Sequence, residues 1–213
     1  MKRPQKIAVL GELYEQLAQE SRYEYVCFID LCGSTDYKQR LVEAGVPSST
    51  WMHRQLIFLQ WSAEHFRKRR CGTVVKTIGD SLMLSFEFTE SAETILSNCL
   101  ELVSFFDRSR AFRNDNAIQL KISLDFGETS NGDIIAGVYD PIGICVDRCA
   151  RLNGLSSSHE IVLSTDFYGR FGNKTLEGIK DMHSMVQSVS RKRETIKGLG
   201  PTTYIIISAQ KPH

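Results

Sequence analysis

Two aspartates, each at the end of a strand-like segment, are the residues of this chain best suited to hold a metal ion. Asp30 ends a run of aromatic and β-branched residues that begins at Tyr23 and is typical of a buried strand. Asp80 lies near the tip of a predicted hairpin between Thr73–Lys76 and Ser81–Phe88. Two hard carboxylates with open water positions suit Mg²⁺ or Mn²⁺ and can hold a pair of ions for an in-line phosphoryl displacement. Taken singly, each aspartate could equally be a turn or capping residue, so the prediction depends on their joint occurrence.

A short polar loop follows Asp30 and carries groups that could bind phosphate. It reads Leu31-Cys32-Gly33-Ser34-Thr35 and precedes a segment able to form a helix. Backbone N–H groups at the start of a helix can bind phosphate. Gly33, Ser34 and Thr35 are therefore candidates for binding a triphosphate, although a Gly-Ser-Thr turn is by itself a common feature of loops.

A helix predicted from about Ile142 to Asn153 places an acid and a base on one face. Asp147 and Arg151 are four residues apart, the spacing of neighbouring side chains on a helix surface. An ordinary surface ion pair would explain this spacing and would contribute well under about 1 kcal/mol. Alternatively, Arg151 could stabilise negative charge that develops on a phosphate during phosphoryl transfer. The spacing leaves both interpretations open.

The predicted elements give a fold that would bring Asp30 and Asp80 together. Their order is strand, helix, hairpin, helix and further strands, which is typical of an α+β fold with a ferredoxin-like βαββαβ core. In such a core the first strand lies beside the hairpin, so the two aspartates could share a divalent ion. The remaining expected elements are a short amphipathic helix over 7–19, helices over Pro47–Gly72 and Ala92–Phe106, and strands over 118–124, Ile134–Val138, Glu160–Ser164 and Thr203–Ser208. The basic stretch around Arg191-Lys192-Arg193 shows no clear pattern and is assigned to no element.

Composition indicates one globular domain in a reducing compartment. A chain of 213 residues that is 42% apolar and 24% charged can bury one sizeable core, which we place at residues 22–208 behind a helical arm over residues 1–21. The net charge of +1 is spread along the chain, so we expect no nucleic-acid partner. No apolar run approaches the roughly 20 residues that cross a bilayer. The six cysteines are typical of reduced core residues, and together these features predict a cytoplasmic protein without a membrane anchor.

Four segments, in order along the chain, resemble the motifs of class III adenylate and guanylate cyclases. The first metal motif of that family resembles Phe28-Ile29-Asp30-Leu31-Cys32-Gly33-Ser34-Thr35, and its Lys-x-x-Gly-Asp hairpin resembles Lys76-Thr77-Ile78-Gly79-Asp80. Its Tyr-Asp-x-x-Gly-x-x-Val-Asn-x-Ala-x-Arg segment is similar to Tyr139-Asp140-Pro141-Ile142-Gly143 with Val146-Asp147-Arg148-Cys149-Ala150-Arg151. Its closing Val-Lys-Gly strand is similar to Ile196-Lys197-Gly198. Together the motifs span residues 22–208.

The resemblance implies a head-to-tail homodimer with two active sites at the interface, each with two Mg²⁺ or Mn²⁺ ions. One subunit would supply Asp30, Asp80 and the backbone carbonyl of Leu31 to the metal ions. The ribose 3′-hydroxyl of a nucleoside triphosphate would then attack the α-phosphorus and release pyrophosphate.

The other subunit would bind the rest of the nucleotide. On the same mapping, Lys76 and Asp140 would contact the edge of the base. Arg151 would act on the transition state and Lys197 on the triphosphate. Without the family resemblance, Lys76 and Lys197 could equally be solvated lysines at strand ends.

One position departs from the family pattern. Where the family has Asn beside the ribose and the reacting phosphate, this chain has Asp147, which accepts hydrogen bonds but cannot donate them when ionised. A cyclase domain of this size with a Val-Asp-x-x-x-Arg helix resembles the Pycsar pyrimidine cyclases, bacterial antiphage enzymes that make cUMP or cCMP for a partner effector. This resemblance implies a pyrimidine triphosphate as the substrate and a separately encoded effector that senses the cyclic nucleotide. We expect UTP, because Lys76 can donate to O2 or O4 of uracil and Asp140 can accept from N3–H.

Other functions remain open at this point. Lys76 and Asp140 together match the residues that read adenine in adenylate cyclases, so ATP is an alternative substrate, and CTP is another. A catalytically inactive cyclase-like sensor would be marked by loss of a metal-binding aspartate or of Arg151, all of which are present. A palm-type polymerase fragment would share the core and the paired aspartates, but the near-neutral charge argues against it.

Overall fold

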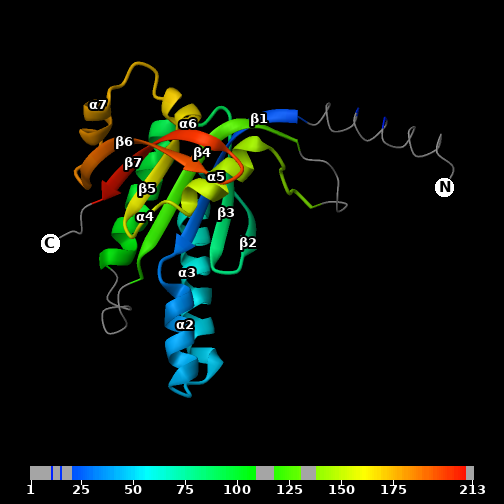
Figure 1. The fold of residues 1–213 in the computed structure, drawn as a ribbon, viewed down its shortest axis with the longest axis vertical. Coiled ribbons are helices and arrows are strands. Elements are labelled where there is room, and N and C mark those ends of the chain that lie inside the picture. The colour runs from blue at the N-terminus through cyan, green and yellow to red at the C-terminus, as the bar shows by residue number, and fades with distance from the viewer. Residues whose placement is uncertain (1–10, 12–14, 16–20, 109–117, 131–137, 210–213) are drawn as a thin grey trace.

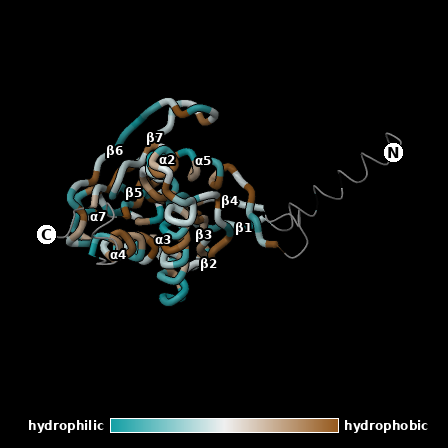
Figure 2. Tube along the Cα trace, turned by 90° about the horizontal axis from the view of Figure 1, so that it is seen from below, coloured by the Kyte–Doolittle hydropathy of each residue, from teal (hydrophilic) through white to brown (hydrophobic). Residues whose placement is uncertain are grey.

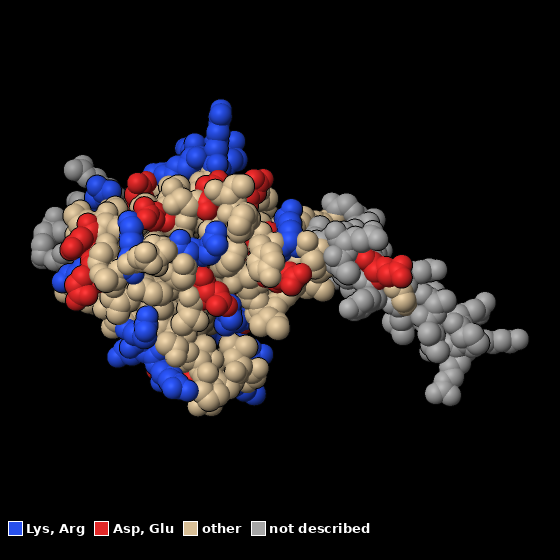
Figure 3. All heavy atoms as spheres, turned by 90° about the horizontal axis from the view of Figure 1, so that it is seen from above, with Lys and Arg blue, Asp and Glu red and all other residues tan. Residues whose placement is uncertain are grey.

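A sheet of seven strands forms the centre of the part of the chain that the structure describes (Figure 1). This computed structural model describes residues 11, 15, 21–108, 118–130 and 138–209. The strand order is β2-β3-β1-β4-β5-β7-β6, and helices pack on both faces of the sheet. No helix within the described ranges is long and apolar enough to cross a membrane. Positive and negative side chains are interspersed over the face seen in Figure 3, in keeping with the net charge of +1.

The first four strands form the ferredoxin-like core that the sequence predicts. β1 (Ser21–Leu31) lies between β3 (Ser81–Glu87) and β4 (Leu120–Ser130) and is antiparallel to both. β2 (Thr73–Ile78) pairs with β3 as the expected hairpin. Helices connect β1 to β2 and β3 to β4, so the βαββαβ order is complete and the α+β prediction is confirmed.

Three further strands of the described chain extend the sheet beyond β4. β5 (Glu160–Ser164) is parallel to β4, and the antiparallel pair β7 (Gly200–Ala209) and β6 (Val186–Ile196) completes the sheet. β6 is an edge strand whose residues 191–195 are all exposed, and Figure 2 shows hydrophilic residues along it. The prediction that Arg191-Lys192-Arg193 belongs to no element is therefore wrong, because these residues lie in β6. A strand exposed along most of its length lacks the apolar alternation by which strands are predicted.

Helices α3 (Ser48–Arg69) and α4 (Ala92–Arg108) cover one face of the sheet. Phe58 and Phe66 from α3 and a row of apolar residues from α4 pack with β1, β3 and β4 into the main core. α2 (Ser34–Glu43) lies beside the first half of α3, where the Arg54 guanidinium is 4.5 Å from the centre of the Tyr37 ring. The two helices project together from the sheet in Figure 1.

The alternation of side chains along β1 places Asp30 on the face of the sheet opposite to the one that α3 and α4 cover. β1 sends its odd-numbered residues from Tyr25 to Ile29 into the main core, and its even-numbered residues toward α5 (Ile144–Asn153). Asp30 continues the even-numbered set, so it lies on the α5 side of the sheet. The same side of the sheet carries α5 with Asp147 and Arg151, the helix residues that the sequence suggested for catalysis.

Some boundaries differ from those predicted. α5 begins at Ile144 rather than near Ile142, because the backbone of Ile142 pairs with Ser130 through N–O distances of 2.8 and 2.9 Å. The helices α6 (Thr165–Gly169) and α7 (Leu176–Lys180) were not predicted, since five residues are too few to show a helical period. The helix expected over 7–19 and the strand expected over 134–138 fall outside the described residues, apart from residues 11, 15 and 138.

Candidate functional site

Asp30 and Asp80 lie at one hollow at the end of β1. The hollow has a volume of about 270 Å³. Its lining comprises Asp30, Leu31, Gly33, Ser34, Thr35, Asp36, Asp80 and Lys121. The fold thus gathers here the residues that the sequence suggested for metal binding and the loop residues Gly33, Ser34 and Thr35 suggested for phosphate binding, whereas Lys197 does not line this hollow.

The loop after β1 is shaped by Gly33. This residue has a φ of 65°, in the left-handed region that favours glycine, and its carbonyl accepts the first hydrogen bond of α2 from the Tyr37 N–H. The turn places Ser34 at the start of α2, where its hydroxyl donates to the Asp80 carboxylate. The loop therefore connects the end of β1 directly to the β2–β3 turn.

Lys121 is a charged residue of this site that the sequence did not single out. It lies opposite Asp30 in the pairing of β4 with β1, and its Nζ is 3.1 Å from Asp30 Oδ2. The only sequence signal is a lysine within a strand of mostly buried residues. Its ion pair with Asp30 follows only from the pairing of β1 with β4.

The electrostatics of Asp30 depend on its burial and on two charged neighbours, Asp80 and Lys121. Burial raises the pKa of Asp30 above its ordinary value of 3.8, and the nearby Asp80 carboxylate raises it further. The Lys121 ammonium acts in the opposite direction on the same pKa. Mutual repulsion between Asp30 and Asp80 is expected of two carboxylates that could share a cation.

The donors at this hollow fit a divalent ion that also binds substrate phosphates. Asp30 and Asp80 offer hard carboxylate oxygens, the ligands that Mg²⁺ and Mn²⁺ prefer. Within the described ranges, no group of three or more His, Cys, Asp or Glu side chains could hold a metal ion. One or two carboxylates completed by water and phosphate oxygens are the usual arrangement for Mg²⁺ in phosphoryl transfer.

A second hollow, of about 260 Å³, adjoins the first at Asp30 and Lys121. It reaches the C-terminal end of α5, where the Asn153 amide donates to the Phe28 carbonyl at 3.0 Å. The end of the predicted catalytic helix is therefore attached to β1 two residues before Asp30.

Lys76 and Asp140, which are 64 residues apart, form an ion pair beside this face. Lys76 Nζ lies 2.6 Å from Asp140 Oδ1 and 2.8 Å from Oδ2, and both side chains are part-buried. The neighbouring Tyr139 hydroxyl donates to the carboxylate of Glu24, a buried residue of β1. This contact holds the segment before α5 against the sheet and places Asp140 next to Lys76.

Arg151 and Lys197 also lie together, but through the backbone. Arg151 Nη1 donates to the Lys197 carbonyl at 2.6 Å. Gly198 has a φ of 83°, and a Cβ there would lie 3.1 Å from the Arg151 guanidinium carbon. Asp147 is exposed one turn earlier on α5, and among the described residues the ion pairs do not include Asp147 with Arg151. The ordinary surface ion pair suggested by their spacing is therefore not formed.

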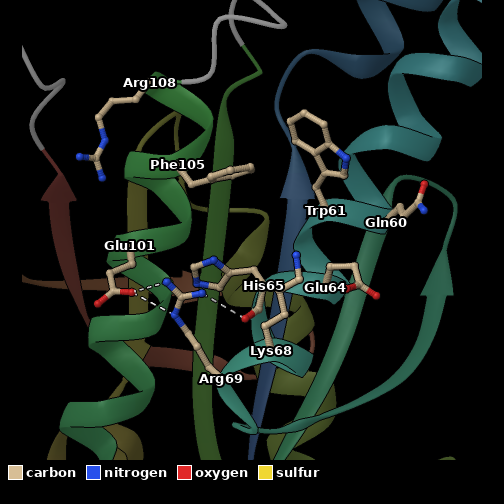
Figure 4. Close-up of a pocket in the computed structure, with 9 residues that line it drawn as sticks. All are labelled: Gln60, Trp61, Glu64, His65, Lys68, Arg69, Glu101, Phe105 and Arg108. Atoms are coloured by element: carbon tan, nitrogen blue, oxygen red, sulfur yellow. Dashed lines mark hydrogen bonds and ion pairs between the residues drawn. The ribbon is translucent and has the colours of Figure 1, made fainter.

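A larger hollow lies away from these residues, between α3 and α4 (Figure 4). Its volume is about 950 Å³, and Trp61, His65 and Phe105 line it together with the Arg69–Glu101 ion pair. None of the residues that the sequence suggested for chemistry contributes to its lining. The larger hollow is therefore separate from the residues that the sequence suggested for metal and nucleotide binding.

Comparison with known proteins identifies the family. The family model described as the adenylate and guanylate cyclase catalytic domain matches residues 6–208. A search of curated proteins finds no match. The fold is similar to that of the guanylyl cyclase Cya2, with a TM-score of 0.70 at 16% identity over 91% of this chain and 95% of that one.

Two further solved structures share the fold. The catalytic core of a rhodopsin-guanylyl cyclase with converted specificity, in complex with ATPalphaS, gives a TM-score of 0.68 at 20% identity over 90% of this chain and 99% of that one. The adenylyl cyclase CyaB from P. aeruginosa gives 0.64 at 19% identity, over 91% and 100% of the two chains. The similarity extends to almost the whole of each domain. With the family match covering most of the sequence, the chain belongs to the adenylate and guanylate cyclase catalytic domain family and is a nucleotidyl cyclase domain.

Proposed function

We propose that this cyclase domain converts UTP to 3′,5′-cyclic UMP and pyrophosphate. The observation that carries the proposal is the pairing of Lys76 with Asp140, which presents one donor and one acceptor side by side. Uracil offers the O2 and O4 acceptors and the N3–H donor on one edge. Lys76 would donate to a uracil oxygen, and Asp140 would accept from N3–H.

Base discrimination would follow from unpaired polar groups. Cytosine replaces O4 with an amino donor, which meets the Lys76 ammonium badly. A buried donor or acceptor left unpaired by the wrong base costs roughly 1–3 kcal/mol, or about tenfold to a hundredfold in rate. The contact between Tyr139 and the buried Glu24 supports this discrimination, since it limits movement of Asp140.

The same residue pair also favours a second substrate, ATP. The Watson–Crick edge of adenine offers the N1 acceptor and the N6 amino donor, which Lys76 and Asp140 could serve as well. A pyrimidine is one ring smaller, so a pocket that prefers UTP must bring its polar groups closer to the ribose. Direct comparison of the substrates therefore decides between the two.

In the proposed reaction, the chain positions the triphosphate at the hollow that Asp30 and Asp80 line. Class III cyclases generally use divalent metal ions, and Asp30, Asp80 and the Leu31 carbonyl would hold two Mn²⁺ or Mg²⁺ ions here. Bound ions of this kind supply Lewis acidity at the ribose 3′-hydroxyl and neutralise phosphate charge. The O3′–P bond to the α-phosphate forms as the bond to the pyrophosphate oxygen breaks, and the 3′-hydroxyl proton is released to solvent.

Side chains and backbone groups of the loop and of α5 would complete the site. N–H groups of residues 33–35 would bind phosphate oxygens at the start of α2. Arg151 would stabilise the charge that develops on the reacting phosphate, and Lys197 would bind the triphosphate. Asp147 would accept a hydrogen bond from the ribose, in place of the asparagine usual in the family.

We propose that two chains assemble head to tail, so that one chain supplies the metal-binding aspartates and the other supplies Lys76, Asp140, Arg151 and Lys197. Exposed apolar side chains next to the Lys76–Asp140 pair support this assembly. Val138, Ile142 and Ile144 are exposed beside Asp140, and Ile144 reaches 75% exposure. Large apolar side chains gathered at one place on a surface commonly mark a protein interface.

We further propose a role in cytoplasmic antiphage defence, with cUMP as a second messenger for a separately encoded effector. This proposal depends on pyrimidine specificity, since cUMP is distinct from the cAMP of general metabolic signalling. Measurement of cellular cUMP before and after phage infection tests it. Constant cUMP during infection would remove the defence role and leave the cyclase proposal intact.

Product analysis with purified protein tests the reaction. The protein is incubated with Mn²⁺ and UTP, CTP, ATP or GTP in turn, and cyclic products are quantified by mass spectrometry. The expected result is the highest kcat/KM for UTP with cUMP as product. A higher kcat/KM for ATP would favour an adenylate cyclase, and the absence of every cyclic product would indicate an inactive nucleotide-binding domain.

A further inference from the structure

A buried ion pair between Arg148 and Asp125 joins α5 to the sheet. The Asp125 side chain on β4 is 0% exposed, and Arg148 on α5 donates from Nε to Oδ2 at 2.6 Å and from Nη2 to Oδ1 at 2.7 Å. The Ser164 hydroxyl and the Phe126 N–H also donate to Oδ1, at 2.5 and 2.7 Å. Four hydrogen bonds therefore fix the position of this carboxylate.

Such a pair is better suited to fixing orientation than to adding stability. Burial raises the pKa of Asp125, whereas the hydrogen bonds and charge of Arg148 and the hydrogen bonds from Ser164 and Phe126 act in the opposite direction and favour the ionised carboxylate. Removing two charges from water costs nearly as much as their attraction returns, so a buried ion pair is weak evidence for stability. The planar guanidinium, however, binds a carboxylate in one defined two-point geometry.

The remaining contacts of α5 constrain its rotation less strongly. Its N-terminus at Gly143 has no side-chain cap, and Cys145 and Cys149 contribute apolar contacts and long thiol hydrogen bonds, at 3.5 Å to the Glu128 carbonyl and 3.4 Å to the Val26 carbonyl. Three further hydrogen bonds of α5 run from Ser123 Oγ to the Cys149 carbonyl at 2.8 Å, from Arg151 Nη1 to the Lys197 carbonyl at 2.6 Å, and from Asn153 to the sheet. The first is made to the helix backbone, the second is a single bond from Arg151 itself to a backbone carbonyl, and the third lies at the last helical residue.

Rotation of α5 matters because of what else the helix carries. Arg148 lies between Asp147 and Arg151 in the sequence, and successive residues of an α-helix are about 100° apart around its axis. Fixing the direction of Arg148 therefore fixes the directions of Asp147 and Arg151. A rotation that moved the Arg151 guanidinium by about 1 Å would be expected to lower the rate substantially.

We infer that Asp125 and Arg148 are positioning residues for cyclisation, which orient α5 so that Asp147 and Arg151 meet the ribose and the reacting phosphate. This inference rests on the proposed cyclase function. It concerns residues that touch neither the substrate nor the metal ions. If the pair positions α5, its loss lowers the rate of the chemical step even when the stability of the fold is restored. If the pair were only structural, rate and stability would change together.

The first test compares single substitutions at the pair. Asp125→Asn keeps the shape of the side chain and removes its charge, and kcat is expected to fall about tenfold to a hundredfold while KM changes less than about twofold. Arg148→Lys keeps the charge but loses the two-point contact, so it should recover only part of the kcat lost in Arg148→Gln. Asp166→Asn is the matched control, because Asp166 is the exposed second partner of Arg148 and its side chain is 53% exposed. Its kcat is expected to stay near that of the unmodified protein.

The second test separates positioning from stability. The double substitution Asp125→Leu with Arg148→Met replaces the ion pair by apolar side chains, which is often neutral or stabilising for a fold. The melting temperature should recover relative to Asp125→Asn while kcat remains low. Recovery of kcat together with the melting temperature would show that the pair is merely structural and would overturn the inference.

A readout without turnover distinguishes failure of this inference from failure of the cyclase proposal. Hydrogen exchange of the backbone amides in residues 144–153 should be faster in Asp125→Asn than in Asp166→Asn. Unmodified protein that makes no cyclic product from any triphosphate would reject the proposed function. Unchanged exchange in Asp125→Asn would reject the positioning of α5 by this pair, whether or not the protein is active.

Discussion

The ammonium group of Lys121 lies 3.1 Å from the carboxylate of Asp30, and the two residues face each other across β4 and β1. A cation that binds Asp30 must compete with this lysine. Lys121→Met is therefore expected to tighten binding of Mn²⁺ to nucleotide-free protein, by about threefold to tenfold, since a like charge beside the ion is removed. Titration of free Mn²⁺ followed by electron paramagnetic resonance measures this change. Weaker binding in the variant would mean that Lys121 supports the metal site instead.

The raised pKa of Asp30 predicts how metal binding depends on pH. Because burial raises this pKa above 3.8, protons compete with Mn²⁺ at a higher pH than for an ordinary aspartate. Mn²⁺ affinity should fall as the pH decreases through the raised pKa, and the fall should be absent from the already weak binding of Asp30→Asn. The same titration performed from pH 8 to pH 4 provides the measurement.

The stability of the fold depends on pH in the opposite direction to the affinity for metal. A carboxyl group with a raised pKa in the folded state favours folding when protonated, and this contribution is lost as the pH rises through the raised pKa. Metal-free Asp30→Asn should therefore melt at a higher temperature than the unmodified protein at pH 8, and the difference should shrink as the pH falls through the raised pKa of Asp30. A lower melting temperature in the variant at pH 8 would show that pairing with Lys121 outweighs the burial of Asp30.

Loss of either metal-binding aspartate should abolish turnover without unfolding the chain. Asp30→Ala and Asp80→Ala each remove one of two carboxylates from the same hollow, and both residues are only part-buried. We expect cyclase activity at background level with an unchanged far-UV circular dichroism spectrum and an unchanged oligomeric mass. Substantial residual activity in either variant would contradict the metal assignment.

The proposed division of the site between two chains predicts complementation. Asp30→Ala protein mixed with Arg151→Ala protein forms heterodimers in which one of the two interfaces keeps every proposed residue. Activity should reappear on mixing and should reach at most about half of the unmodified level for the heterodimers, since only one site of two is complete. Subunit exchange is confirmed separately with differently tagged chains. Inactivity of all mixtures despite exchange would mean that each chain contains its own complete site.

Lys76 is expected to control the choice of base more than the binding of metal. Lys76→Ala removes the donor of the Lys76–Asp140 pair, so the preference for UTP over the other triphosphates should fall about tenfold to a hundredfold. Affinity for Mn²⁺ in the absence of nucleotide should stay unchanged, because Lys76 is absent from the lining of the Asp30 hollow. Specificity constants for all four triphosphates provide the measurement. An equal loss for every base would show that Lys76 does not read the base.

The core elements could be predicted because burial leaves a period in the sequence. α4 shows the helical spacing of its buried face, and β1 and β3 show the continuous apolar runs of strands buried on both faces; the order of these elements is enough to place Asp30 near Asp80. Where burial leaves no period, prediction failed. This is the case for the exposed edge strand β6 and for the five-residue helices α6 and α7.

The charged residues that the sequence did not reveal are defined by long-range pairing. The alternation of β4 indicates that Asp125 belongs to its polar set, but α5 covers that face and buries it. Lys121 likewise acquires a partner only from the register of β1 with β4. Both contacts join segments that are distant in the sequence, so neither local composition nor spacing could predict them.

The charge of β6 has a consequence for how copies of the chain meet. An open strand edge offers unpaired N–H and C=O groups to other chains, and consecutive charges there oppose intermolecular strand pairing. Arg191, Lys192 and Arg193 are all exposed on β6, so two copies that approach edge to edge at this strand repel each other. The exposed basic residues of β6 thus oppose extension of the sheet by edge-to-edge pairing between copies of the chain.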